Sequence, residues 1–252
     1  MTEKIKFQNK QGQNLAALLE LPEGKPSGYA IFAHCFTCNK NLTAVRNIGR
    51  ALNKNNIAVL RFDFTGLGES EGDFEDTNFT SNVDDLIAAT DFLKNNYEAP
   101  AILIGHSLGG AAVLFATHKI PSIKAIVTIG APSNPSHVSH IFESSIAEIQ
   151  QNGIAELSIG GRPFKIKEQF LEDIKSHKIE LATANLNVPI MIFHSPIDTT
   201  VEIANAAKIY KSAKHPKSFI SLDKADHLLS DKNDSEFVGL MIAAWTKRYL
   251  EN

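Results

Sequence analysis

Short apolar runs alternate along the chain with longer segments in which apolar residues recur every three or four positions. The apolar runs span residues 29–33, 57–62, 101–104, 125–129 and 188–193, with a last candidate at 218–222. Continuously apolar runs of this length are typical of strands that a parallel sheet buries on both faces. The periodic segments between them supply the crossovers that parallel strands need. The pattern therefore predicts an α/β fold with a mostly parallel sheet and helices on both faces.

The start of the chain differs from this alternation. Residues 4–7 and 15–20 are two extended segments around Gln11-Gly12, which predicts an antiparallel hairpin at one edge of the sheet. With this hairpin the sheet has about eight strands. The predicted helices cover residues 41–54, 81–95, 109–119, 201–211 and 233–250. Asn78 or Thr80 is the expected cap of the second helix.

Residues 131–186 interrupt the alternation. This segment has no strong strand pattern and only weak amphipathic stretches at 138–150 and 165–175. Insertions on α/β scaffolds usually lie above the strand ends and often carry function. We therefore expect one domain, residues 1–252, with a small helical cap formed by residues 131–186.

Composition and charge narrow the class of partner. Hydrophobic residues make up 43% of the chain, enough to cover both faces of a sheet. The formal net charge of −3 gives no electrostatic reason to bind nucleic acid. No apolar run reaches the length of a signal segment or a membrane span. We expect a cytoplasmic protein that acts on small molecules without nucleic acid or membrane partners; the pattern does not determine its oligomeric state.

The pentapeptide Gly105-His106-Ser107-Leu108-Gly109 has the form Gly-x-Ser-x-Gly, follows the run 101–104 and opens an alanine-rich helix. A serine on such a strand-to-helix turn stands clear of the sheet, and its glycines let neighbouring chains approach closely. The helix N-terminus offers unpaired N–H groups where an oxyanion develops. Ser107 is the predicted nucleophile, although the five letters alone also fit a Gly-Ser turn without chemistry.

A serine hydroxyl needs a base within hydrogen-bond reach and an acid that holds the base in one tautomer. Asp198 follows the run 188–193, and His227 follows the run 218–222. The order serine, acid, histidine is the one that accompanies this kind of turn. We therefore predict catalytic roles for Ser107, Asp198 and His227.

Other side chains compete for two of these roles. Of the nine histidines, His227 alone lies in the expected final loop. His34, His106 and His194 end predicted strands near the same face, where a packed or hydrogen-bonding role is the alternative. Glu202 is the fallback for the acid.

The remaining site residues come from the loop after the first parallel strand and from the cap. The backbone N–H groups of Phe36 and Leu108 are the predicted oxyanion hole. The candidate substrate contacts are Cys35, Phe36, His106, Phe142 and Phe164, with Ile146 and Phe170 as further apolar lining. No metal or organic cofactor is needed for such a site.

Two further motifs have a simpler interpretation. The only cysteines, Cys35 and Cys38, exclude a scaffold with several disulfides, but a Cys-x-x-Cys pair before a helix leaves a thiol redox role open. In the loop at 61–70, glycines, Asp63 and Ser70 are interpreted as turn-forming residues without chemistry.

These motifs together resemble the α/β-hydrolase superfamily over nearly the whole chain. More narrowly, strings such as "RFDFTGLGESEGDFEDTNF", "GHSLGGAA" and "GGRPFKIKEQF" resemble the hydrolase half of bifunctional proteins fused to an OsmC-type reductase domain. The matching region ends at Asn252, so we expect a stand-alone relative or one half of such a fusion. The chain is also similar to feruloyl and cinnamoyl esterases, which have glycine where Cys35 and Cys38 stand.

The resemblance implies a serine hydrolase that cleaves small carboxylic esters through an acyl-enzyme. An aminopeptidase-like amide hydrolase would use the same residues, and the thiol pair offers a redox alternative. A binding protein on the same scaffold usually lacks one of the three catalytic residues, and here all three are present.

Overall fold

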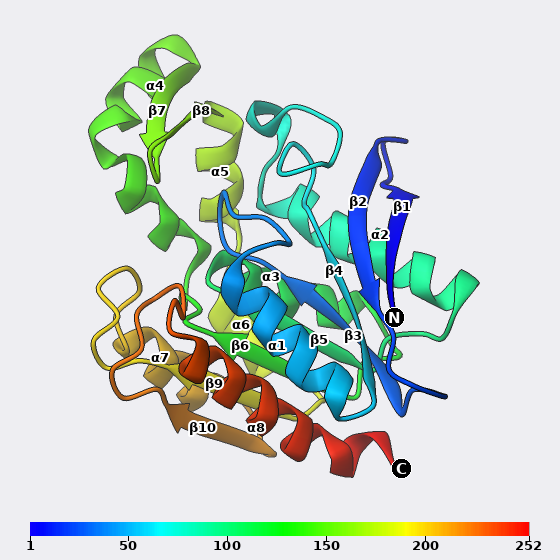
Figure 1. The fold of residues 1–252 in the computed structure, drawn as a ribbon. Coiled ribbons are helices and arrows are strands. Elements are labelled where there is room, and N and C mark those ends of the chain that lie inside the picture. The colour runs from blue at the N-terminus through cyan, green and yellow to red at the C-terminus, as the bar shows by residue number, and fades with distance from the viewer. Residues whose placement is uncertain (252) are drawn as a thin grey trace.

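Eight strands form one sheet in the order β1-β2-β4-β3-β5-β6-β9-β10 in the computed structural model, which describes residues 1–251 (Figure 1). The strands are β1 (Thr2–Gln8), β2 (Asn14–Glu20), β3 (Gly28–Ala33), β4 (Ile57–Phe62), β5 (Ile102–His106), β6 (Ala125–Ile129), β9 (Ile190–His194) and β10 (Lys217–Ser221). β1 and β2 pair antiparallel, and the other strands run parallel to one another. The predicted fold class, eight-stranded sheet and edge hairpin are confirmed.

Helices cover both faces of this sheet. α1 (Thr43–Lys54) and α8 (Lys232–Leu250) lie side by side on one face (Figure 1). Gly239 of α8 makes this close packing possible, since a Cβ there would lie 2.6 Å from the Cβ of Ala51. The other face carries α2 (Phe79–Asn96), α3 (Leu108–Ala116) and α7 (Ala204–Ser212). Within residues 1–251, no helix is long and apolar enough to cross a membrane.

Local sequence explains where these elements start. Asn78 caps α2, accepting a hydrogen bond from the N–H of Ser81, whose hydroxyl oxygen accepts one from the N–H of Asn78. Asp231 caps α8 through the N–H of Asn233. Every residue of β3, β4, β5, β6 and β9 is buried, which is why these strands are mostly apolar in the sequence, with the buried Arg61 of β4 as a charged exception.

The segment 131–186 is not purely helical, which corrects the prediction. It contains η3 (Pro135–Ser145), α4 (Ile146–Asn152), the antiparallel pair β7 (Ile154–Ile159) and β8 (Arg162–Lys167), α5 (Glu168–Ser176) and α6 (Ile179–Ala184). α4, β7 and β8 project beyond the sheet (Figure 1), whereas α5 packs on α2 and α6 on α3. The hairpin escaped the sequence pattern because both strands are half-exposed, so they have neither a continuous apolar run nor a clear alternation.

Candidate active site

Ser107 sits on a sharp turn between β5 and α3. Its backbone has φ 54° and ψ −124°, a strained conformation for a residue with a side chain. Its N–H donates to the carbonyl of Ile129 over 2.8 Å. A Cβ at Gly105 would lie 2.3 Å from the carbonyl oxygen of Gly109, and one at Gly109 would lie 2.4 Å from that of Ala33. The flanking glycines are therefore required by backbone contact, as the motif predicts.

Asp198 and His227 meet at the ends of β9 and β10. The Nδ1 of His227 lies 2.7 Å from Oδ2 of Asp198. The other carboxylate oxygen accepts the N–H groups of Thr200 and Val201, each over 2.9 Å. Burial alone would raise the pKa of Asp198, but these hydrogen bonds and the nearby His227 lower it below its ordinary value. The fallback Glu202 is exposed. The carboxylate is thus an ionised acceptor that fixes the tautomer of the imidazole.

Gly130, directly after β6, brings this pair next to the serine. A Cβ at Gly130 would lie 3.4 Å from both Oδ2 of Asp198 and Nδ1 of His227. The preceding residue, Ile129, holds the N–H of Ser107. Within residues 1–251 the Ser107 hydroxyl has no hydrogen-bond partner, and the residue is 9% exposed. Serine and histidine in unliganded hydrolases often draw together only when substrate binds.

The three rival histidines each donate to a backbone carbonyl. His106 Nε2 lies 2.7 Å from the carbonyl oxygen of His227, and His194 Nε2 lies 2.7 Å from that of Val201. His34 Nδ1 lies 2.8 Å from the carbonyl oxygen of Cys35. A carbonyl can only accept, so these nitrogens carry the protons.

Burial keeps these three rings neutral. It lowers the pKa of His106 to about 3 and that of His34 to about 4, and it lowers the pKa of His194 as well. His106, predicted as a substrate contact, is 2% exposed and faces the backbone of His227 instead. Each histidine therefore braces one of the loops that converge at this edge of the sheet.

The loop between β3 and α1, residues 34–42, contains Phe36 and both cysteines. Cys35 and Cys38 form a disulfide with their Cα atoms 5.3 Å apart. Between them, Thr37 has φ 58°, in the left-handed region that β-branched residues rarely adopt. Among described residues, the N–H groups of Phe36 and Leu108 have no hydrogen-bond acceptor. Both predicted oxyanion donors are thus unpaired.

A buried ionic network holds the far end of this loop. Lys40 is 2% exposed; its Nζ lies 2.5 Å from Asp63 Oδ2 and from Glu69 Oε2, and its N–H donates to Asp63 Oδ1 over 2.6 Å. Arg61 donates to the carbonyl of Lys40 and pairs with Glu20 over 2.7 Å. The sequence pattern does not reveal this network and predicts only a turn-forming role for Asp63. A buried lysine has no sequence signal, because lysines are almost always exposed.

Aromatic side chains join this loop to the cap. The ring of Phe36 lies 5.5 Å from that of Phe170 and 6.5 Å from that of Phe142. Phe74, which the sequence analysis did not single out, links Phe36 to Phe164 at 5.6 and 5.0 Å. Phe142 is 1% exposed. The predicted contacts Phe36, Phe142 and Phe164 therefore belong to one aromatic cluster at the base of the cap.

Arg162 adds a polar contact between cap and loop. It is the first residue of β8, and its guanidinium donates to the carbonyl of Thr37. The same guanidinium lies 5.2 Å from the centre of the Phe164 ring. The cap thus touches the disulfide-bridged part of the loop directly.

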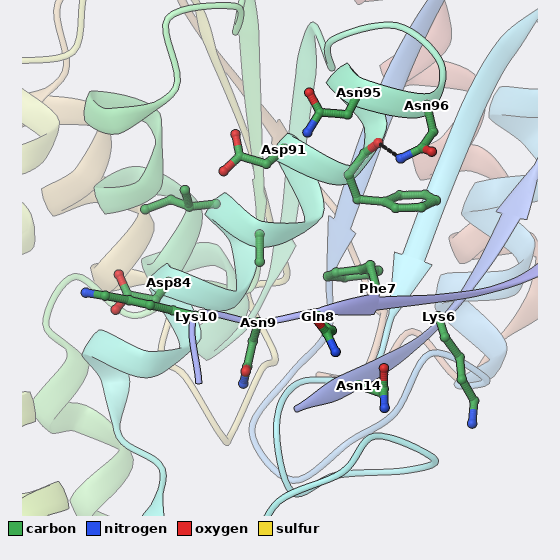
Figure 2. A pocket seen from close by; sticks show the side chains of 13 residues that line it. Lys6, Phe7, Gln8, Asn9, Lys10, Asn14, Asp84, Asp91, Asn95 and Asn96 are labelled. Atoms are coloured by element: carbon green, nitrogen blue, oxygen red, sulfur yellow. Dashed lines mark hydrogen bonds between the residues drawn. The ribbon is translucent and has the colours of Figure 1, made fainter. Parts of the chain in front are cut away.

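A groove of about 640 Å³ lies elsewhere, between β1 and α2 (Figure 2). Its polar side chains include Lys6, Asn14, Asp84, Asp91 and Asn95. None of the predicted site residues lines it, and β1 is at the edge of the sheet farthest from β9 and β10. This groove is therefore separate from the candidate active site.

Comparisons with known proteins identify the family and the fold. Residues 25–165 match the family described as "Serine aminopeptidase, S33". The chain is 49% identical to the esterase domain of a Rhodothermus marinus protein, over 99% of both chains, with a TM-score of 0.82. Est1E of Butyrivibrio proteoclasticus, solved with ferulic acid, shares the fold at 22% identity and a TM-score of 0.81, over 98% of this chain and 100% of that one.

More distant relatives are longer than this chain. It is 24% identical to the human mitochondrial palmitoyl-protein thioesterase ABHD10, covering 72% of this chain and 60% of that protein. It is 23% identical to YfhR of Salmonella typhimurium, covering 90% and 74%. These relatives do not test the resemblance to OsmC fusion proteins, which stays a prediction. The matched family model and the near-complete overlap with the Rhodothermus marinus domain show that this chain belongs to the α/β-hydrolase family described as "Serine aminopeptidase, S33".

Proposed function

We propose that the protein is a serine esterase that cleaves small carboxylic esters through an acyl-enzyme. The observation that carries this proposal is the 2.7 Å contact between His227 Nδ1 and Asp198 Oδ2 beside the strained turn of Ser107. In the proposed reaction His227 Nε2 takes the proton of the Ser107 hydroxyl as its oxygen attacks the ester carbonyl. Asp198 stabilises the imidazolium that forms.

Two backbone donors complete the proposed mechanism. The N–H groups of Phe36 and Leu108 receive the oxyanion, where the N-terminal dipole of α3 also favours negative charge. His227 then gives its proton to the leaving alcohol, and a water molecule repeats the attack on the acyl-enzyme. This chemistry requires only groups that the chain itself supplies.

The substrate class follows from the loop and the cap. Phe36 and Phe164 are half-buried and offer apolar surface to an acyl group, and the buried Phe142 supports Phe36 from within the cluster. The Rhodothermus marinus relative is named as an esterase domain, which favours esters over other acyl compounds. The cytoplasmic location expected from the sequence remains a prediction.

A fluorophosphonate probe tests the nucleophile. We expect labelling at Ser107, none in Ser107→Ala, and strongly reduced labelling in His227→Ala, with unchanged thermal unfolding as the control for folding. A panel of p-nitrophenyl esters of increasing acyl length then gives the acyl preference. An unlabelled wild-type protein that hydrolyses no ester in the panel would contradict the proposal.

Amide hydrolysis is the second candidate, because the matching family is described as serine aminopeptidases. The same three residues serve both reactions, and the leaving group decides between them. Adding amino acid p-nitroanilides and a palmitoyl thioester to the panel separates the possibilities. We expect kcat/KM for the best ester to exceed that for every anilide.

A further inference from the structure

Hydrogen bonds hold the loop of residues 34–42 at its two ends, whereas other contacts hold its middle. At one end, His34 bonds the carbonyl of Cys35 over 2.8 Å. At the other, the N–H of Lys40 bonds Asp63 over 2.6 Å. Between these points the backbone has one internal hydrogen bond, from Cys38 N–H to the Cys35 carbonyl over 3.1 Å. The Cys35 carbonyl belongs to the same planar peptide as the Phe36 N–H, so these bonds from His34 and Cys38 orient that N–H, whereas the turn through Phe36 and Thr37 depends on other constraints.

Those constraints are the disulfide and the cap. The Cys35–Cys38 bridge closes a ring that contains both peptide groups, with the Cα atoms 5.3 Å apart. Inside the ring Thr37 has φ 58°, which costs a β-branched residue about 1–3 kcal/mol and persists only where the surroundings impose it. Among the described residues, the guanidinium of Arg162 on the Thr37 carbonyl is the one polar contact that Phe36 and Thr37 receive from outside the loop.

We propose that the Cys35–Cys38 disulfide is a positioning element for the oxyanion hole, so that its reduction lowers turnover and its re-formation restores it. This inference rests on the proposed function, in which the Phe36 N–H receives the oxyanion. With the bridge open, Thr37 can leave the left-handed region and the Cys38 N–H can leave the Cys35 carbonyl, so that the peptide carrying the Phe36 N–H keeps the bond from His34 but loses the one from Cys38. The donor then loses part of its alignment with the developing charge while the rest of the site is intact.

The exposure of the two sulfurs favours such a reaction. Cys35 is 4% exposed, whereas Cys38 is half-buried and therefore the sulfur that a reductant reaches. A thiolate of a dithiol reductant attacks Cys38 Sγ and displaces Cys35 Sγ as a thiolate, which takes up a proton. The second reductant thiol resolves the mixed disulfide and releases Cys38 as a thiol. Two electrons pass to the protein, and the reductant leaves as its own disulfide.

The position of the bridge also suits regulation rather than scaffolding. It spans only four residues on a protein with a large apolar core, so it adds little to the overall stability of the fold. Disulfides in reducing compartments are usually transient and catalytic or redox-sensing. In the cytoplasm expected from the sequence, the bridge would be reduced or re-formed according to the ratio of thiols to disulfides in the cell.

The expected effect is on kcat. Loss of one oxyanion donor lowers kcat by about 100- to 1000-fold in serine proteases, and we expect at least a 10-fold loss here because the displaced peptide keeps part of its contact. KM changes less, because the ground-state carbonyl depends little on these donors. A bridge with a purely structural role would instead alter thermal unfolding and leave kcat unchanged.

The test compares redox states of the whole chain. The protein is reduced with dithiothreitol, desalted without oxygen and assayed with p-nitrophenyl acetate, and a portion is re-oxidised with oxidised glutathione. Alkylation and mass measurement count the thiols in each sample. We expect kcat to fall at least 10-fold with two free thiols and to return with none.

Variants separate this effect from other actions of the reductant. Cys38→Ser and the double variant Cys35→Ser, Cys38→Ser should have low kcat that dithiothreitol does not change, with thermal unfolding showing that they fold. Full kcat in reduced wild type or in a folded variant overturns the proposal, as does an oxidised sample that still has two thiols. If neither redox state hydrolyses ester or labels with fluorophosphonate, the proposed function itself fails.

Discussion

Two regions of the molecule are held by different contacts: the loops at the strand ends, which we call the frame of the candidate site, and the cap of residues 131–186. The loops carrying Asp198 and His227 are fixed by directional hydrogen bonds to backbone atoms, such as the 2.7 Å contact between His106 and the His227 carbonyl. The cap contacts Phe36 through the aromatic rings of Phe142 and Phe170, while hydrogen bonds such as those of Thr80 to Asp173 join it to α2. Directional bonds set positions to fractions of an ångström, whereas apolar packing tolerates substitution of similar volume.

This contrast assigns the two regions different tasks. A proton transfer needs donors and acceptors at fixed distances, so the loops need directional contacts. An acyl pocket needs shape and apolar surface, which a cap can vary without disturbing the frame below it. Changes in the loops should therefore act on kcat, and changes in the cap on KM.

The largest effect on kcat is expected at Asp198, which holds the proposed base His227. Asp198→Asn keeps the shape of the side chain but favours the wrong tautomer of His227, so kcat should fall about 10⁴-fold. Steady-state kinetics with a p-nitrophenyl ester measures this. Glu202→Gln, four residues on and exposed, is the matched control and should retain wild-type kcat. Equal activity of the two variants would remove Asp198 from the mechanism.

The buried network tests whether the frame depends on ionic contacts. Asp63→Ala leaves Lys40 charged, buried and without its main partner, and should lower the free energy of unfolding by about 3–5 kcal/mol. Urea unfolding monitored by circular dichroism gives the value. Glu69→Gln removes the partner whose side chain is 71% exposed and should cost less than about 1 kcal/mol. A loss of unfolding free energy below about 1 kcal/mol in Asp63→Ala would show that water or another acceptor binds the Lys40 ammonium instead.

Acid should weaken the frame through its neutral histidines. The pKa of His106 is about 3 and that of His34 about 4 in the fold, below the ordinary 6.5, so the unfolded chain binds more protons between these values. Their contribution to the free energy of unfolding is complete above pH 6.5. It is lost as the pH falls, by about 2 kcal/mol per histidine between pH 7 and pH 5.

The pH dependence can be assigned with one variant. His106→Gln keeps a donor for the His227 carbonyl and cannot titrate, so its unfolding free energy should change about 2 kcal/mol less than that of the wild type between pH 7 and pH 5. Burial raises the pKa of Asp85 to about 6, so this carboxyl acts in the opposite direction and is unchanged in both proteins. Identical pH slopes would mean that His106 is protonated in the fold.

The smallest effect is expected in the cap. Arg162→Ala removes the hydrogen bond from the cap to the Thr37 carbonyl, so it acts through the loop and should lower kcat by about 3- to 10-fold with KM nearly unchanged, since one charge-assisted hydrogen bond is lost at a partly exposed position. Lys165→Ala is a matched control on the same strand, because Lys165 pairs with Glu75 at the surface. A larger effect on KM than on kcat would show that Arg162 acts on substrate binding and not through the loop.

Much of this protein could be predicted from its sequence. The apolar runs predict the buried strands. The glycines beside Ser107 predict a turn that no larger residue fits. The chain order then gave Asp198 and His227, which the fold brings to 2.7 Å. The half-exposed hairpin β7–β8 left no such pattern, since its residues alternate weakly between core and water.

The sequence by itself determined the sheet, its crossovers and the turn at Ser107, because period and glycine placement are local properties of the chain. Only the tertiary structure decided the partners of Lys40, the neutral state of His106 and the constraint on Thr37. Each of these depends on which distant atoms exclude water or accept a hydrogen bond. Such contacts arise between segments that are far apart in sequence, and no local pattern encodes them.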